Sequence, residues 1–211
     1  GSSSTYTVGL LNALYAHNGR FAGAERLARE ACSIEIERCG APIGKQDQYI
    51  AAFGGLQFIQ FNPDETVYVD PIICSPRTKQ QLERRLLMLY TGNTRQTGDI
   101  LREQQANTER DEARRASLAR MVELAHALRA ALIADDLAAF GELLHEGWVR
   151  KRELASGISS PQIDGWYARA RAAGAAGGKI LGAGGGGFLL LYAPEERHEA
   201  IVAALPELRP T

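Results

Sequence analysis

The sequence predicts an α+β fold built from two sub-domains. Stretches with the apolar pattern of strands stand near residues 56–72, 86–92 and 177–192, whereas the pattern from 95 to 172 is almost entirely helical. Strands that enclose a long helical segment, without regular strand–helix alternation, favour α+β over a parallel sheet. The 211 residues, 45% of them hydrophobic, suffice for two small cores. We expect domains over residues 1–80 and 81–211.

The first 80 residues are expected to hold three helices and a hairpin. Ser2, Ser3 and Ser4 are N-cap candidates for a helix with apolar residues at helical spacing, and "HNG" at 17–19 ends it. The stretches "LQFIQF" and "TVYVDPI" alternate around "NPDE", which predicts two strands and a turn. The expected elements are helices up to residue 16, over about 22–39 and over 46–53, and strands at 56–61 and 66–72.

The rest of the chain is expected to have strands on either side of a long helical segment. "RTKQQLERR" predicts a charged helix, and "LLMLYTG" a buried strand that Gly92 closes. The helical pattern that follows is interrupted near 107–111, at 135–136 and at "SGISSP", residues 156–161. The final part, "GGKILGAGGGGFLLLYAP", has the pattern of a strand, a glycine loop and a strand, before a helix from about residue 195.

Charge and hydropathy exclude several classes of protein. The formal net charge is −1, from 24 basic and 25 acidic side chains, so nothing favours nucleic acid or an anionic membrane as a partner. The run "ERDEARRASLAR" alternates in sign at helical spacing, which is typical of a solvated helix face. No apolar run is long enough to span a bilayer, and the N-terminus lacks a signal-peptide pattern.

The three cysteines show no paired motif. Cys32 and Cys39 are seven residues apart, which predicts one helix face and small buried thiols rather than metal ligands. An odd number of unpaired cysteines, the third being Cys74, fits a reduced, cytoplasmic setting.

The opening "GSSST" has two interpretations. One is a remnant of an expression tag, with no bearing on the fold. The other is an anion-holding turn whose helix directs its N-terminus at a phosphate.

The glycine-rich stretch "KILGAGGGGFLLLY" contains G-x-G-x-x-G at Gly182, Gly184 and Gly187. A dinucleotide fingerprint requires a helix directly after it, and here a second apolar strand follows, so that interpretation fails. The alternatives are a flexible hinge or a loop whose backbone closely approaches another group such as a polyphosphate.

The stretch "GAPIGKQDQ" imitates a Walker A loop at Gly40, Gly44 and Lys45. Its spacing is one residue short, however, and Gln46 stands where Ser or Thr is required. The stretch instead puts Lys45 and Asp47 at the start of a short helix, where an aspartate is by default a capping residue.

Three glutamates precede this stretch in "EACSIEIERCG", namely Glu30, Glu35 and Glu37. Most glutamates on a helix face solvent. One carboxylate together with a serine hydroxyl would nevertheless suit Mg²⁺, which prefers a few hard oxygen ligands.

Taken together, these stretches resemble the GHMP kinases, the superfamily of galactokinase, homoserine kinase and mevalonate kinase. "GSSST" is similar to the family's second motif, "EIERCG" followed by "GKQDQ" to its catalytic-aspartate helix, and "KILGAGGGG" to its third motif. "LYTGNTR", "KRELASGIS" and "IDGWYARARAAGAAGGKILGAGGGG" resemble the members that act on D-glycero-D-manno-heptose 7-phosphate. The resemblance covers nearly the whole chain. It implies part of a ribosomal-S5-domain-2-like domain up to about residue 80, followed by a helix-elaborated ferredoxin-like domain.

The resemblance implies an ATP site with bound Mg²⁺. The residues expected on the ATP phosphates are Gly1, Ser2, Ser3, Ser4, Gly184, Gly185 and Gly186. Ser3 and Glu35 are the implied Mg²⁺ ligands, with Glu37 as the alternative to Glu35. These assignments agree with the chemistry of phosphoryl transfer, which requires mainly positioning and neutralisation of charge.

The resemblance also implies a base and a sugar site. Asp47 is expected to accept the proton of the attacking hydroxyl. Lys45 is expected to hold the transferred group or lower that hydroxyl's pKa, although structural pairing with Asp47 is an equal alternative. Gly182 is expected near the sugar. The basic side chains considered for its distal phosphate are Arg95, Lys151 and Arg152, each of which has a surface helix charge as its alternative.

The implied reaction is transfer of phosphate from ATP to the C1 hydroxyl of D-glycero-D-manno-heptose 7-phosphate, giving the 1,7-bisphosphate for heptose biosynthesis. In that family several strands and a first motif precede the phosphate loop, whereas this sequence opens on the loop. We therefore expect a complementary N-terminal segment or self-association, and negligible activity of the chain alone. The alternatives are a fucokinase-like anomeric sugar kinase or a non-catalytic assembly module.

Overall fold

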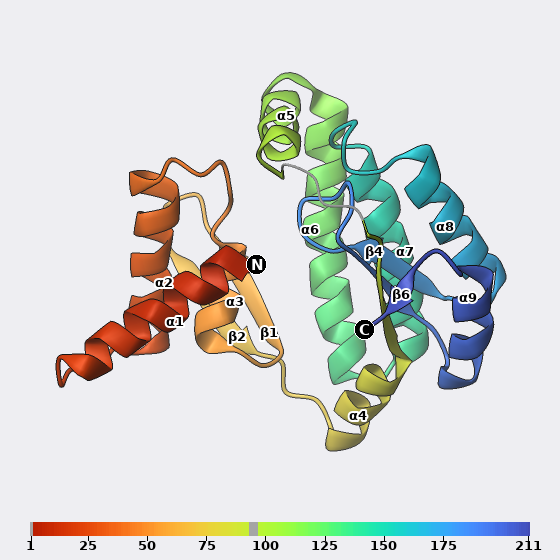
Figure 1. Cartoon of the computed structure of the whole chain (residues 1–211), viewed down its shortest axis with the longest axis horizontal. Coiled ribbons are helices and arrows are strands. Elements are labelled where there is room, and N and C mark those ends of the chain that lie inside the picture. Colours follow the sequence, from red (N-terminus) through yellow and green to blue (C-terminus); the bar gives the residue numbers. More distant parts are fainter. Residues whose placement is uncertain (1, 93–96) are drawn as a thin grey trace. The chain divides into compact units, whose positions relative to one another are not determined.

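The computed structural model describes residues 2–92 and 97–211, and the chain divides into one unit up to Ile72 and another from Ile73 (Figure 1). The sequence placed this boundary at residue 80, which lies inside a continuous helix of the second unit. Among the described residues, no helix is both long and apolar enough to cross a membrane.

The first unit packs three helices together with a two-stranded antiparallel hairpin (Figure 1). Its core joins Val8, Leu27 and Ala31, and a neighbouring cluster places Tyr49 against apolar residues of the hairpin. The elements are α1 (Ser2–His17), α2 (Ala24–Cys32), the π-helical segment η1 (Ser33–Arg38), α3 (Gln46–Phe53), β1 (Gln57–Phe61) and β2 (Val67–Pro71).

The second unit contains a four-stranded antiparallel sheet in the order β4-β5-β3-β6. Its elements are α4 (Pro76–Arg85), β3 (Leu86–Tyr90), α5 (Thr97–Arg110), α6 (Glu112–Ile133), α7 (Leu137–Arg152), α8 (Pro161–Ala172), β4 (Gly177–Ile180), β5 (Phe188–Tyr192), η2 (Glu195–Arg197), α9 (His198–Ala204) and β6 (Arg209–Pro210). This order, with α5 to α8 inserted after the first strand, is the ferredoxin-like topology elaborated with helices. The predicted α+β class is confirmed.

Side-chain caps fix where α4, α6, α7 and α8 begin. Ser75, Asp111, Asp136 and Ser160 each accept a hydrogen bond from a backbone N–H in the first turn of the helix that follows. The three predicted interruptions of the helical segment lie at the last three of these caps. The core beneath the helices includes Leu89, Leu189, Leu191, Trp148 and Trp166.

The structure differs from the sequence prediction in three places. The helix expected over 22–39 changes to π-helical geometry after Cys32. A π turn shifts the phase of the following side chains, so Cys32 is buried as predicted while Cys39 is exposed. Ser2–Ser4 lie in the first turn of α1 rather than in front of it. The short edge strand β6 was missed, since two residues carry no periodic pattern.

Candidate active site

The N-terminal turn of α1 presents serines to solvent and to the core. Ser2 and Ser3 are exposed, whereas Ser4 is 1% exposed. The first amides of a helix lack intrahelical acceptors and carry partial positive charge, so this turn suits an anion such as a phosphate. Gly1, the first residue expected on the ATP phosphates, lies outside the described residues.

Glu35 is a buried carboxylate in η1, with only 8% of its surface exposed. The Gln48 Nε2 atom donates a hydrogen bond to Glu35 Oε2 at 2.5 Å. The Thr7 hydroxyl lies 3.5 Å from Glu35 Oε1 and 3.0 Å from the Ser3 carbonyl oxygen, to which it donates. α1, η1 and α3 therefore bring Thr7, Glu35 and Gln48 together, with Thr7 one helical turn after Ser3.

The alternative ligand, Glu37, has different surroundings. It is exposed, and its carboxylate accepts a hydrogen bond from the Ser33 hydroxyl at 2.7 Å, within one turn of the same segment. Of the two carboxylates, it is Glu35 that faces α1 and α3.

The oxygen atoms around Glu35 suit a hard cation. Gln48 is fully buried, and its Oε1 has no hydrogen-bond partner among the described residues. A buried acceptor without a donor is unfavourable unless a water or another ligand satisfies it. One carboxylate, the neighbouring Thr7 hydroxyl and an unsatisfied amide oxygen are hard oxygen donors of the kind that Mg²⁺ with its bound waters prefers. Among the described residues, no group of three His, Cys, Asp or Glu side chains could hold a metal ion by itself.

Asp47 lies in the first turn of α3, next to Gln48 in sequence, and is half-buried. The N-cap position belongs to Lys45, so Asp47 is not the capping residue there. The Lys45 ammonium forms an ion pair with Glu65 in the turn between β1 and β2. Lys45, Tyr49 and Glu65 also line an open cavity of 750 Å³ within the first unit, a volume in the range of small-molecule sites.

The contribution of Thr7 was missed from the sequence. It follows Ser3 by four residues, so the two side chains lie on the same face of α1. That spacing was available in the sequence, but Thr7 carries no motif by itself. Its proximity to Glu35, 28 residues later in the chain, follows from the packing of α1 beside η1.

The glycine loop of the second unit, residues 182–187, connects β4 and β5. Gly184 has a φ of 107°, and a Cβ there would lie 2.7 Å from the Ile158 Cα and carbonyl oxygen. The Gly185 amide donates to the same carbonyl at 2.9 Å, and Thr91 donates to the Gly187 carbonyl from both its amide and its hydroxyl. Glycine at position 184 thus permits a backbone-to-backbone contact that fixes the loop.

Two of the three basic residues considered for a distal phosphate have protein partners. The Lys151 ammonium donates to the Gly182 carbonyl at 2.6 Å. The Arg152 guanidinium pairs with Asp164 at 2.7 Å and lies over the Trp148 ring. Arg95 lies outside the described residues. Lys151 therefore adds a side-chain anchor to the glycine loop.

Comparison with known proteins gives two family matches. Residues 1–55 match the GHMP kinases N terminal domain, and residues 124–210 match the GHMP kinases C terminal model.

Individual relatives are similar over most of this chain. It is 30% identical over 205 residues to the D-glycero-alpha-D-manno-heptose 7-phosphate kinase of Campylobacter jejuni, covering 97% of this chain and 60% of that protein. It is 29% identical over 198 residues to the bifunctional fucokinase/GDP-fucose pyrophosphorylase of Arabidopsis thaliana, covering 92% of this chain and 19% of that protein. The chain thus spans about 60% of the length of the first of these relatives.

Solved structures show the same fold. A D-glycero-D-manno-heptose 1-phosphate kinase from Bacteroides thetaiotaomicron superimposes with a TM-score of 0.66 at 26% identity, covering 98% of this chain and 56% of that one.

Proposed function

Since the chain belongs to the GHMP kinases, we propose that it acts in an ATP-dependent sugar kinase that phosphorylates the C1 hydroxyl of D-glycero-D-manno-heptose 7-phosphate. The relatives named for heptose phosphates support this substrate. The product would be the 1,7-bisphosphate, released with ADP.

The observation that carries the proposal is the hydrogen-bonded pair of Glu35 and Gln48 beside the first turn of α1. A helix N-terminus alone would accept any anion. A buried carboxylate facing the same turn adds a place for a cation. A nucleoside triphosphate with its bound metal needs an anion site and a cation site side by side. Ser3 and Glu35 would hold Mg²⁺, which supplies neutralisation of phosphate charge when bound. The hydroxyl of Thr7 would orient the Glu35 carboxylate.

In the proposed reaction Asp47 is the base. The C1 oxygen of the sugar forms a bond to the γ-phosphorus, and the bond from that phosphorus to the β,γ-bridging oxygen breaks with its electron pair leaving on ADP. The hydroxyl proton passes to the Asp47 carboxylate and from there to solvent. An anomeric hydroxyl is more acidic than an ordinary alcohol, so a carboxylate is an adequate base. Lys45, released from Glu65, would be placed to contact the transferred group.

The glycine loop would supply backbone amides to the nucleotide. Successive glycines at 184, 185 and 186 all have positive φ, and amides in such turns can converge on an anion. Gly182 would lie nearer the sugar. The contacts of Gly184 with Ile158 and of Lys151 with Gly182 would keep the loop rigid.

The distal phosphate of the sugar is the feature that selects heptose 7-phosphate. We propose Arg95, Lys151 and Arg152 as its candidate partners, since a phosphate with about two negative charges is typically held by a fork of basic groups. The bonds of Lys151 to Gly182 and of Arg152 to Asp164 would then have to be shared or exchanged on binding.

A comparison of substrates tests the proposal. It uses the protein purified from its own cells together with any segment that accompanies it there. ADP release is measured with ATP, Mg²⁺ and, in parallel, heptose 7-phosphate, unphosphorylated heptose and L-fucose, and phosphorus NMR identifies the phosphorylated carbon. We expect the highest kcat/KM with heptose 7-phosphate and a new signal at C1. A preference for L-fucose would favour a fucokinase-like enzyme, in line with the plant relative. Absence of turnover with every sugar would favour the non-catalytic alternative.

A further inference from the structure

A cavity between α6, α7 and β4 is lined, apart from Lys151, by residues that have no role in the proposed phosphoryl transfer. It has a volume of 170 Å³, and most of its wall is apolar, with Leu124 and Leu128 from α6 and Leu144 from α7. A comparable apolar cavity of about 150 Å³ in another protein holds a benzene molecule. The apolar part of a ligand here would therefore have about the size of one ring.

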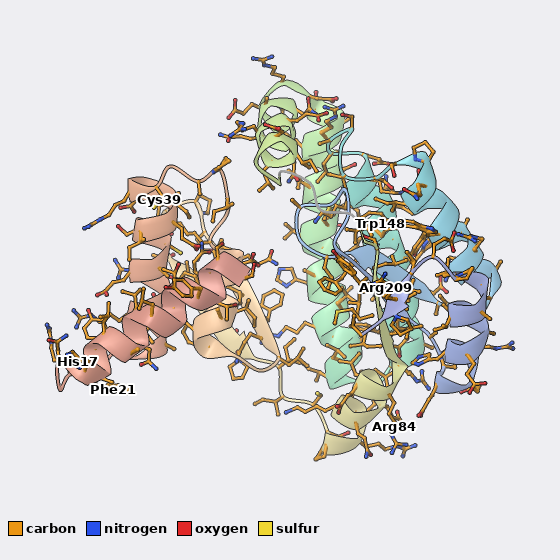
Figure 2. All side chains as sticks on the ribbon, viewed as in Figure 1. His17, Phe21, Cys39, Arg84, Trp148 and Arg209 are labelled. Atoms are coloured by element: carbon orange, nitrogen blue, oxygen red, sulfur yellow. The ribbon has the colours of Figure 1, made fainter. Side chains whose placement is uncertain are left out.

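The polar groups of this cavity are donors and cations. Trp148 lines it and is 1% exposed, and its indole N–H has no acceptor among the described residues. Figure 2 shows Trp148 in the interior of the second unit. A buried N–H without an acceptor is unfavourable, so a ligand that offers an oxygen would be stabilised there.

Lys179 gives the cavity an uncompensated positive charge. It lies on β4, and no hydrogen bond or ion pair joins its ammonium to any of the described residues. Burial lowers the pKa of Lys179, because an ammonium in an apolar environment loses hydration. Lys151 also lines the cavity, but its ammonium is engaged with the glycine loop. No acidic residue is among the described residues that line it.

We propose that this cavity binds a small carboxylate with an apolar body about the size of one ring. The carboxylate would pair with Lys179 and accept the Trp148 N–H, while the ring would contact the leucines of α6 and α7. This occupant satisfies the charge, the orphaned donor and the apolar wall together. A neutral molecule would leave Lys179 uncompensated, and a compact inorganic anion would leave the apolar wall unfilled.

The test is a titration with benzoate and with its neutral isostere benzamide, followed by the two indole N–H signals in ¹H–¹⁵N spectra of the native protein. Trp166 is the internal control, since its indole N–H already donates to Glu207 at 3.2 Å. We expect benzoate to shift the Trp148 signal saturably, to leave the Trp166 signal in place and to bind at least about tenfold more tightly than benzamide, roughly 1.4 kcal/mol.

Two pairs of variants separate the effect of charge from the effect of cavity shape. Lys179→Met should lower the affinity for benzoate to that for benzamide. Lys179→Arg should keep the preference for benzoate over benzamide. Gly147→Leu should abolish binding of both, because Gly147 lines the cavity on α7 and a Cβ there meets no atom within 4 Å. Gly165→Leu, on α8 with equally open surroundings, is the matched control and should bind normally.

Several results would overturn the proposal. Equal affinity for benzoate and benzamide in the unmodified protein would reduce the site to a neutral apolar cavity. A shift that does not saturate, or that affects Trp166 as strongly as Trp148, would indicate non-specific binding. Unchanged benzoate binding by Gly147→Leu would place the ligand elsewhere.

Discussion

The carboxylate of Glu35 and the side-chain amide of Gln48 form a buried hydrogen bond of 2.5 Å between η1 and α3. Glu35 belongs to a segment that the sequence predicts as ordinary helix, and the π turn there directs its side chain toward α1. This pair distinguishes Glu35 from the other glutamates of the same region.

The first prediction concerns the metal requirement of the kinase. Glu35→Gln should raise the Mg²⁺ concentration for half-maximal rate about tenfold or more, because a carboxylate ligand is lost while the side-chain volume is kept. Ser3→Ala should act in the same direction. The measurement is the initial rate as a function of Mg²⁺ at saturating ATP.

Glu30→Gln is the matched control for that prediction. Glu30 accepts hydrogen bonds from Tyr15 and Arg26, and neither of these residues is a partner of Glu35 or Gln48. The Mg²⁺ concentration for half-maximal rate of Glu30→Gln should equal that of the unmodified enzyme. Should Glu37→Gln raise the requirement while Glu35→Gln does not, the ligand would be Glu37.

The second prediction concerns Asp47 as the base. Asp47→Asn should lower kcat by about 10²–10⁴-fold, since the amide cannot accept the hydroxyl proton. The affinity for ATP, measured by equilibrium binding, should change little. A variant with near-normal turnover would leave Asp47 with a structural role in the first turn of α3.

The third prediction concerns the close approach at Gly184. Gly184→Ala should lower the free energy of unfolding by at least about 2 kcal/mol more than Gly182→Ala, because it adds a backbone clash to an unfavourable φ. Gly182 has a φ of 73° and open space around the Cβ position, so Gly182→Ala measures the cost of the unfavourable φ without a clash. Urea unfolding of both variants provides the comparison, and equal losses would mean that the Ile158 contact is not limiting.

The fourth prediction concerns pH. Burial lowers the pKa of His145 from its usual 6.5, with the positive charges of Arg171 and Arg152 acting in the same direction and Glu142 opposing them. Its Nδ1 atom lies 2.8 Å from the Tyr167 hydroxyl oxygen. A histidine with a depressed folded pKa binds more protons when unfolded, so stability falls as pH drops below about 6.5.

Replacement of His145 should flatten this dependence. In His145→Gln the free energy of unfolding should change less between pH 7.5 and pH 5 than in the unmodified protein, as urea titrations at each pH would measure. His126→Gln, at an exposed position on α6, is the control and should keep the original slope. Parallel slopes in all three proteins would contradict the assignment.

The sequence alone determined most of the local structure, because caps, glycines and hydrophobic periodicity are short-range signals. The helix breaks at Asp111, Asp136 and Ser160 could be predicted from the sequence, because each residue caps the helix that follows. The hairpin was readable from alternation around a turn. The family resemblance rested on motifs that are contiguous in the chain, and the family matches agree with it.

Only the tertiary structure decided which groups meet. The contact of Thr7 with Glu35 and the burial of Gln48 depend on how α1 and α3 pack against η1, and the π turn that orients Glu35 has no periodic signature in sequence. Likewise, nothing local distinguishes Lys179 from an exposed strand lysine. Lys179 is enclosed by α6 and α7 because residues far apart in the chain pack together. Such packing outweighs the local conformational preference of a strand residue.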